Sequence, residues 1–165
     1  MSRLEEMIAT ARLHAAGNRV AGLTAAPALH LAFVACMDSR IDVFTMFGLS
    51  TGDAHVLRNA GGIVTDDMIR SLAISQRMLG TRQIIIIQHT GCGLLHVSDD
   101  DFADSLERET GERPRWKAGG FEDVEDNVRR SMAAVRTSPF IPYTGEVFGF
   151  VYDLDTPRLV EVDPE

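Results

Sequence analysis

The chain has 165 residues, of which 45% are hydrophobic and 24% charged, a composition typical of a globular domain and not of a disordered or fibrous protein. Its formal net charge of -8 argues against a nucleic-acid partner, which would require a basic face. No apolar run approaches the roughly 20 residues needed to cross a bilayer. We therefore expect one domain over residues 1–165, with neither nucleic acid nor a membrane as its partner.

The N-terminal segment predicts an amphipathic helix over residues 2–16. Ser2 and Glu5 have the spacing of a capping box, which closes the first turn of a helix. Apolar residues then recur at helical spacing until Gly17-Asn18 ends the pattern.

The same N-terminal sequence also bears on the compartment. MSRLEEMIATARL carries charges throughout and lacks the uninterrupted apolar stretch and cleavage site of a secretory signal. We therefore expect a cytoplasmic protein. Because that compartment keeps thiols reduced, a disulfide between the only two cysteines, Cys36 and Cys92, is disfavoured.

The first strand is predicted over residues 29–35, LHLAFVA, a nearly continuous apolar run of the kind found in parallel strands covered on both faces. A short helix is expected over 42–47 and a second strand over 54–57. The segment RNAGG at 58–62 follows, and its double glycine indicates a turn.

The middle of the chain predicts a helix followed by a strand. Thr65 or Asp66 is placed to cap the helix, and Gly80 to end it. Residues 84–88 form the most strand-like run of the sequence. The remaining expected elements are a helix over 100–109, a loop over 111–120, a helix over 122–136 and strands over 146–154 and 159–162.

Strands that alternate with helices predict an α/β fold with a mostly parallel central sheet flanked by helices. The last two strands predict an antiparallel edge strand or hairpin at the C-terminus. Ligands of such sheets bind beyond the carboxyl ends of the strands. Cys36 and the segment HTGCG at 89–93 each follow a predicted strand, so we expect them at the same edge.

Cys36, His89 and Cys92 offer two sulfurs and one nitrogen, a ligand set that suits zinc. A structural zinc site normally has four Cys or His ligands, but there is no third cysteine. The other histidines lie outside the pattern: His14, His30, His55 and His96. The fourth ligand is therefore Asp38, a distant histidine or water. Bound water would ionise near neutral pH and become a nucleophile.

Asp38 and Arg40 are two residues apart, so an extended segment would let the guanidinium hold the carboxylate at two points. That pairing would keep Asp38 off the metal. Alternatively, Asp38 binds the zinc and closes the site, or the two residues form only a surface ion pair. The sequence leaves these alternatives open.

Three motifs together, Cys36-x-Asp38-x-Arg40, RNAGG at 58–62 and His89-x-x-Cys92, resemble those of the β-class carbonic anhydrases, in their compact bacterial or archaeal-like branch. The resemblance implies one Zn²⁺ per chain, held by Cys36, His89 and Cys92, with Asp38 and Arg40 as a catalytic dyad. It also implies that zinc-bound hydroxide converts carbon dioxide reversibly to bicarbonate and a proton.

The resemblance further implies a homodimer or a dimer of dimers, in which the helix over 2–16 embraces the partner. One subgroup of the family has an inhibitory bicarbonate pocket with a tryptophan three positions before the first cysteine. This chain has Phe33 at that position, so we do not expect that regulation.

Two other functions remain as alternatives. The same zinc site would also suit hydrolysis of carbonyl sulfide or carbon disulfide, which present a similar electrophilic carbon. A protein that binds zinc without catalysis, or that senses redox state through Cys36 and Cys92, would hold the metal without turnover. For the neighbouring groups we expect a structural role that supports the site for Arg58, an ordinary loop position for His96, and a helix cap in the acidic run 98–101.

Overall fold

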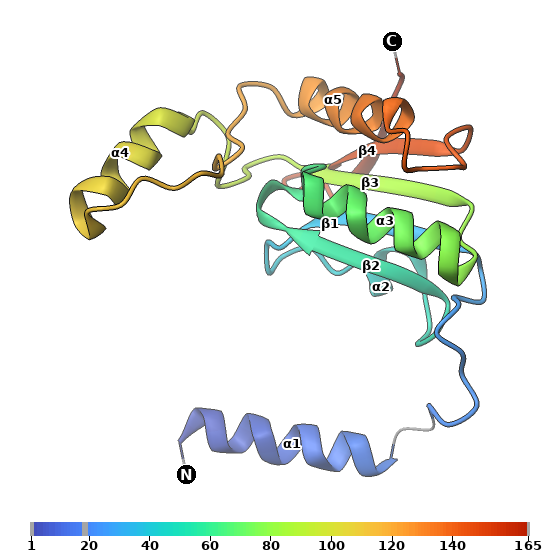
Figure 1. The fold of residues 1–165 in the computed structure, drawn as a ribbon. Helices are drawn as coiled ribbons and strands as arrows, with labels where there is room; N and C mark the ends of the chain where they lie inside the picture. Colours follow the sequence, from blue (N-terminus) through green and yellow to red (C-terminus); the bar gives the residue numbers. More distant parts are fainter. Residues whose placement is uncertain (1, 18–19, 165) are drawn as a thin grey trace.

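The structure is built on a five-stranded sheet with the strand order β2-β1-β3-β4-β5 (Figure 1). The computed structural model describes residues 2–17 and 20–164. The strands are β1 Leu31–Cys36, β2 Ala54–Asn59, β3 Gln83–His89, β4 Val147–Asp153 and β5 Arg158–Val162. The first four pair in parallel, whereas β5 pairs with β4 antiparallel. The predicted mostly parallel sheet with a C-terminal hairpin is therefore confirmed.

The helices also follow the predicted order, with small changes in their bounds. They are α1 Arg3–Gly17, α2 Val43–Phe47, α3 Asp66–Leu79, α4 Asp99–Thr110 and α5 Val124–Thr137, with a 3-10 turn η1 at Ala60–Gly62. Thr65 caps α3, where its side chain accepts from the N–H of Met68, and Ser98 caps α4 in the same way. The capping box of α1 is present, because the main-chain N–H groups of Ser2 and Glu5 each donate to the other residue's side chain. Asn18 lies outside the described residues.

The first strand starts later than its apolar run suggests. β1 begins at Leu31 instead of residue 29, because residues 27–30 form a turn in which the N–H of His30 donates to the carbonyl of Pro27 at 3.1 Å. His30 itself has a φ of 56°, which is incompatible with a strand. The strand then continues through Cys36, one residue beyond the predicted end.

The larger apolar core lies between the sheet and the two helices α3 and α5, which cover the same face in Figure 1. Val34 and Ile86 point to this face from adjacent strands and are fully buried. Leu72 of α3 and Val128 of α5 pack against them. Because side chains alternate along a strand, the neighbouring residues face the opposite side.

The opposite face of the sheet carries a smaller core. Phe33 and Ile87 are buried there together with Val43 at the start of α2. The rings of Phe33 and Phe47 lie with their centroids 4.9 Å apart. These two cores hold the carboxyl ends of β1 and β3 in place, and those ends carry the candidate site.

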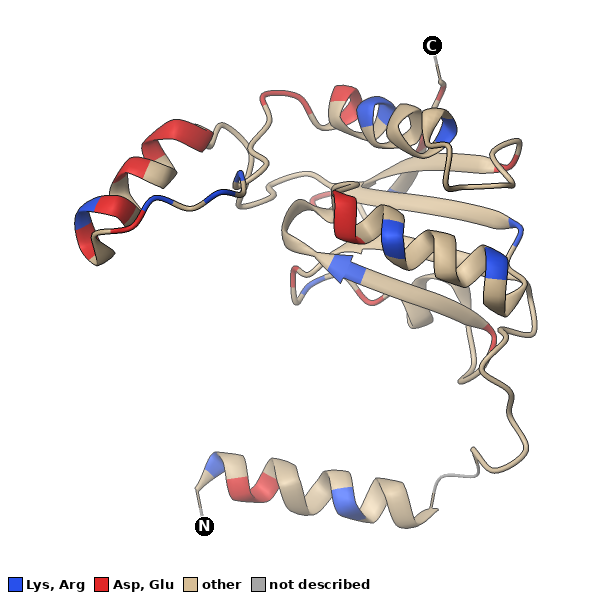
Figure 2. Ribbon diagram, in the orientation of Figure 1, with Lys and Arg blue, Asp and Glu red and all other residues tan. Residues whose placement is uncertain are grey.

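Two helices stand away from the sheet in Figure 1. No side chain of α1 is buried, and α4 buries only Ala103. Acidic residues dominate α4, as Figure 2 shows, and Arg113 from the following loop pairs with Asp104 and Glu107 on that helix. Among the described residues, no helix combines the length and the apolar character needed to span a membrane.

Candidate metal centre

The ends of two adjacent parallel strands bring the candidate ligands together. Cys36 is the last residue of β1, His89 is the last residue of β3, and Cys92 lies in the turn after His89. One potential ligand atom from each of the three lies within 4.8 Å of the others. Within residues 2–17 and 20–164, no other group of three or more Cys, His, Asp or Glu side chains has ligand atoms spaced closely enough to hold a metal.

The chemistry of these groups fits zinc. All three residues are buried, with exposed fractions of 4% for Cys36, 1% for His89 and 8% for Cys92. The Nδ1 atom of His89 lies 2.9 Å from the carbonyl oxygen of Thr90, an arrangement that assigns the ring proton to Nδ1. His89 Nε2 is buried and has no hydrogen-bond partner among the described residues. Its lone pair is therefore available to a metal beside the two sulfurs.

The two thiols differ in how readily they ionise. Burial raises the pKa of Cys36, but the neighbouring His89 ring and the N–H groups of Asp38 and Gly61 outweigh it and bring the pKa to about 7. Burial raises the pKa of Cys92 above its ordinary value. Because metals bind the thiolate form, Cys36 is the better prepared of the two ligands before a metal arrives.

Asp38 and Arg40 form a two-point ion pair beside the cluster. Arg40 donates from Nε to Oδ1 of Asp38 at 2.9 Å and from Nη2 to Oδ2 at 2.7 Å. These contacts hold the pKa of the Asp38 carboxyl well below its usual range, so the carboxylate stays ionised. Its Oδ2 lies 3.8 Å from Nε2 of His89, but Asp38 is not a member of the three-residue cluster.

Glycines in η1 allow the chain to pass close behind Cys36. Gly62 has a φ of +62°, and a Cβ placed on it would lie 2.7 Å from the backbone nitrogen of Cys36 and 3.0 Å from the carbonyl oxygen of Ile87. Any larger residue would therefore collide with both ligand-bearing strands. The predicted turn at 58–62 thus brings the Gly61 N–H to the Cys36 sulfur.

Several groups that support the site could not be predicted from the sequence, and most of them belong to the main chain. The carbonyl of Thr90 orients His89, and the carbonyl of Gly91 accepts from Arg40 Nη2 at 3.1 Å. The Thr90 hydroxyl in turn accepts from the N–H of Leu154 at 3.0 Å, which ties this turn to the β4–β5 connection. Only the strand-end position of these residues gave any signal of such roles.

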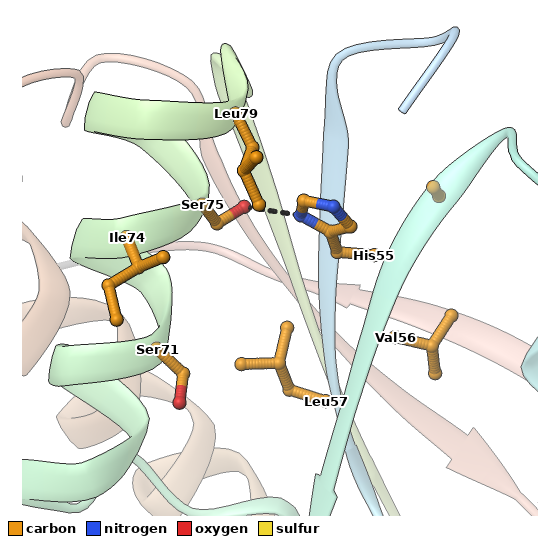
Figure 3. A pocket seen from close by; sticks show the side chains of 8 residues that line it. His55, Val56, Leu57, Ser71, Ile74, Ser75 and Leu79 are labelled. Atoms are coloured by element: carbon orange, nitrogen blue, oxygen red, sulfur yellow. Dashed lines mark hydrogen bonds between the residues drawn. The ribbon is translucent and has the colours of Figure 1, made fainter. Parts of the chain in front are cut away.

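The other histidines with described contacts are engaged elsewhere. His30 Nδ1 lies 3.0 Å from the carbonyl of Gly80, and His96 Nδ1 lies 2.7 Å from a carboxylate oxygen of Glu122. His55 lines a separate hollow of about 430 Å³ between β2 and α3, where Nδ1 contacts the hydroxyl of Ser75 at 2.8 Å (Figure 3). These contacts place all three histidines in structural hydrogen bonds away from the cluster.

A cavity of about 280 Å³ opens onto the cluster. It is lined by Cys36, Asp38 and Cys92 together with the apolar side chains of Met37 and Leu94. The lining of the cavity thus combines candidate metal ligands with apolar side chains. The fold and this site define an α/β metalloprotein with a Cys-His-Cys zinc centre and the carboxylate of Asp38 beside it.

Comparison with known proteins gives the family. The carbonic anhydrase family model matches residues 31–159. The β-carbonic anhydrase 1 of Mycobacterium tuberculosis is 51% identical over 138 residues, which cover 84% of this chain and 85% of that protein. The chain therefore belongs to the β-class carbonic anhydrase family, as its motifs indicated, and zinc is the metal of this centre.

Two further relatives show how far the likeness extends. The crystal structure of carbonic anhydrase from Streptococcus mutans superimposes with a TM-score of 0.89 at 40% identity and covers 99% of both chains. A carbon disulfide hydrolase of Acidithiobacillus thiooxidans is 33% identical over 151 residues, covering 76% of this chain and 69% of its own. The family thus includes proteins named for different substrates.

Proposed function

We propose that this chain catalyses the reversible hydration of carbon dioxide to bicarbonate and a proton, with one Zn²⁺ held by Cys36, His89 and Cys92. The observation that carries the proposal is the convergence of the three ligand atoms within 4.8 Å, next to a carboxylate paired with Arg40. Membership of the β-class carbonic anhydrases supports the same reaction.

Each polar residue of the site then has a distinct task. When bound, zinc acts as a Lewis acid that lets water act as a nucleophile near neutral pH. Asp38, kept ionised by Arg40, accepts a hydrogen bond from the attacking water and orients it toward the carbon of carbon dioxide. Met37 and Leu94 line the cavity with apolar atoms, which suits a small linear substrate without charge.

Asp38 could either bind the metal or act in the dyad with Arg40, and its contacts favour the dyad. Both carboxylate oxygens accept from the Arg40 guanidinium, and Oδ1 also accepts from the Arg40 main-chain N–H at 2.9 Å. A carboxylate engaged at both oxygens is a poor additional metal ligand. In this proposal Cys36, His89 and Cys92 would hold the zinc, and water would supply the remaining donor.

Carbon disulfide is the second candidate substrate, because relatives named carbon disulfide hydrolase share about a third of the residues, 33% and 34% in two sequences of Acidithiobacillus thiooxidans. The higher identity of 51% to the mycobacterial β-carbonic anhydrase 1 favours carbon dioxide. Carbonyl sulfide would be attacked at the same kind of carbon.

The decisive experiment is stopped-flow hydration of carbon dioxide with zinc analysis of the same sample. We expect about one zinc per chain and turnover that is lost when a chelator removes the metal and restored when zinc is returned. Turnover of carbon disulfide or carbonyl sulfide with none of carbon dioxide would reassign the substrate. Bound zinc without turnover of any of the three would favour a binding or redox-sensing protein.

The exposed helix α1 supports a homodimer, which is the assembly that we propose. Leu4, Met7, Ile8 and Leu13 lie on α1 with exposed fractions between 42% and 76%. Burying such side chains against a second copy would be favourable by roughly 1.5–3 kcal/mol each. Light scattering should show a dimer or a dimer of dimers, and a monomer at micromolar concentration would refute this assembly.

We also propose a single catalytic domain over residues 1–165 in the cytoplasm. Both cysteines are free thiols in the structure, and a reducing compartment would preserve them as metal ligands. Fractionation of the native cells should find the protein with cytoplasmic markers, and recovery with extracellular material would refute the placement.

A further inference from the structure

Arg58 reaches from β2 to two main-chain oxygens of the site. It lies near the end of β2, opposite Ala35 of β1. Its Nε donates to the carbonyl of Cys36 at 2.9 Å, and its Nη2 donates to the carbonyl of Asp38 at 2.6 Å. One guanidinium therefore holds the backbone of a metal ligand and of the dyad carboxylate at the same time.

The two carbonyls lie where the sheet stops restraining the chain. The last main-chain bond from this segment to β2 is donated by the N–H of Met37 to the carbonyl of Asn59 at 2.8 Å. Beyond it the chain turns, and the N–H of Ile41 donates to the carbonyl of Asp38 at 3.0 Å. The Arg58 contacts thus bridge the interval between the end of the strand and this turn.

The geometry of a guanidinium makes this bridge rigid. Its N–H groups lie in one plane at fixed angles, so two of them set the separation and direction of the carbonyls they bind. A carboxylate that orients a nucleophile must be held within a fraction of an ångström of its productive place. Asp38 Oδ2 lies 3.8 Å from His89 Nε2. At this short distance, a small shift of the Asp38 backbone would change the position of the carboxylate relative to the metal ligands.

Within the described part of the chain, no acidic side chain forms an ion pair with Arg58, although its charge helps to lower the pKa of Asp42. Its Nε and Nη2 donate instead to the carbonyls of Cys36 and Asp38. Its side-chain donors are thus directed at the backbone of the Cys36-Met37-Asp38 segment and not at a surface carboxylate.

We propose that Arg58 is a positioning residue for the reaction, which sets the Asp38 carboxylate in register with the metal ligands through the carbonyls of Cys36 and Asp38. This inference rests on the proposed function. It assigns to the arginine of the RNAGG segment a task in turnover that is separate from metal binding and from the stability of the fold.

The test compares Arg58→Met with Arg77→Met. Arg77 also donates to a main-chain carbonyl, that of Phe140 at 2.9 Å, but it lies in the last turn of α3, at the other end of the sheet from the site. Both variants lose an arginine and its contact with a carbonyl. Only Arg58→Met should lower kcat, by about tenfold to a hundredfold, with KM nearly unchanged and zinc content equal to wild type.

A second readout does not depend on turnover. In the cobalt-substituted protein, the visible absorption bands of Arg58→Met should shift relative to wild type and to Arg77→Met, because the Cys36 ligand is no longer held by its carbonyl. Arg58→Lys, which keeps one donor in place of two, should recover part of kcat.

The outcomes separate the two proposals. A kcat of folded Arg58→Met equal to that of Arg77→Met, or a loss of kcat that follows a loss of zinc, would overturn the positioning role. If Arg58→Met does not fold, the comparison of Arg58→Lys with Arg77→Lys decides in the same way. Wild-type protein that binds zinc but fails to hydrate carbon dioxide would instead count against the proposed function.

Discussion

The two halves of the site are held in different ways. Cys36 and His89 end adjacent strands and, with Cys92, are at most 8% exposed. The dyad lies on a turn nearer to solvent, with side-chain exposures of 18% for Asp38 and 54% for Arg40. Core packing places the ligands, whereas hydrogen bonds place the dyad.

This difference in burial separates the residues expected to bind the metal from those expected to take part in catalysis. Buried donors on packed strands move little, so the ligand half should bind zinc with or without an intact dyad. An ion pair with a solvent-exposed arginine contributes little to stability, about 0–1 kcal/mol in general, which agrees with the proposed role of the dyad half in orientation. Substitutions in the two halves should therefore fail in different measurements.

The largest effect is expected from Cys36→Ser in the ligand half. A serine hydroxyl is a poor replacement for thiolate as a zinc ligand, so zinc content should fall from about one per chain to nearly none, and hydration activity should disappear. Metal analysis after gel filtration checks the first result and stopped-flow the second.

The neighbouring Met37→Leu is the control for Cys36→Ser, because Met37 lies in the same segment but is 66% exposed and offers no ligand required by the cluster. It should keep its zinc. Retention of a full complement of zinc by Cys36→Ser would break the assignment of Cys36.

Asp38→Asn should produce the next largest effect, in the dyad half. The variant removes the negative charge that orients the nucleophile, and comparable losses of one catalytic contact cost about 10²- to 10³-fold in kcat. Zinc content should stay at the wild-type value. Asp42→Asn, which keeps a side chain able to cap α2, should retain activity. Equal kcat for the two variants would remove Asp38 from the mechanism.

The ligand half was predictable from the sequence because residue type and strand-end position suffice for it. An apolar run predicts a strand, adjacent parallel strands end at one edge, and His89-x-x-Cys92 fits one turn. The dyad half was predictable only as alternatives, because its arrangement depends on the main chain. The carbonyl of Gly91 and the two carbonyls bound by Arg58 carry no residue signature.

The N-terminal helix shows the same limit in the fold. Its capping box predicted the start of α1 correctly, since capping is a local property of four residues. Its apolar pattern predicted an amphipathic helix, and the family resemblance implied that this helix embraces a partner; no α1 residue is buried within the chain. The spacing of apolar residues along a helix does not show what those residues pack against, because that depends on the tertiary and quaternary structure.

Gly62→Ala should weaken the support behind both halves by an intermediate amount. Gly91→Ala is its matched control, because both glycines have a φ of +62° but only Gly62 has backbone atoms within 4 Å of the added Cβ. Each variant carries the conformational cost of about 1–2 kcal/mol for a positive φ. The collision with Cys36 should add about 1–3 kcal/mol to the loss for Gly62→Ala alone.

Urea unfolding of the zinc-saturated proteins measures that difference as a change in midpoint at constant slope. Equal unfolding free energies for the two alanine variants would show that β1 yields to the added methyl group. The close passage of η1 behind Cys36 would then be unnecessary for the ligand half.

Arg40→Lys should have the smallest effect on stability and so gives the finest test of the comparison. Lysine keeps the charge but replaces the two-point contact with Asp38 by a single one. Because the Arg40 side chain is 54% exposed, the free energy of unfolding should change by less than about 1 kcal/mol. Arg129→Lys on α5, whose arginine pairs with Glu125 and Asp126, should show a similar small change and leave turnover intact. For Arg40→Lys, however, kcat should fall about tenfold, because the carboxylate loses its fixed orientation. A large loss of stability with unchanged kcat would mean that the Asp38–Arg40 pair belongs to the scaffold, and the division between a buried half that binds and an exposed half that orients would fail.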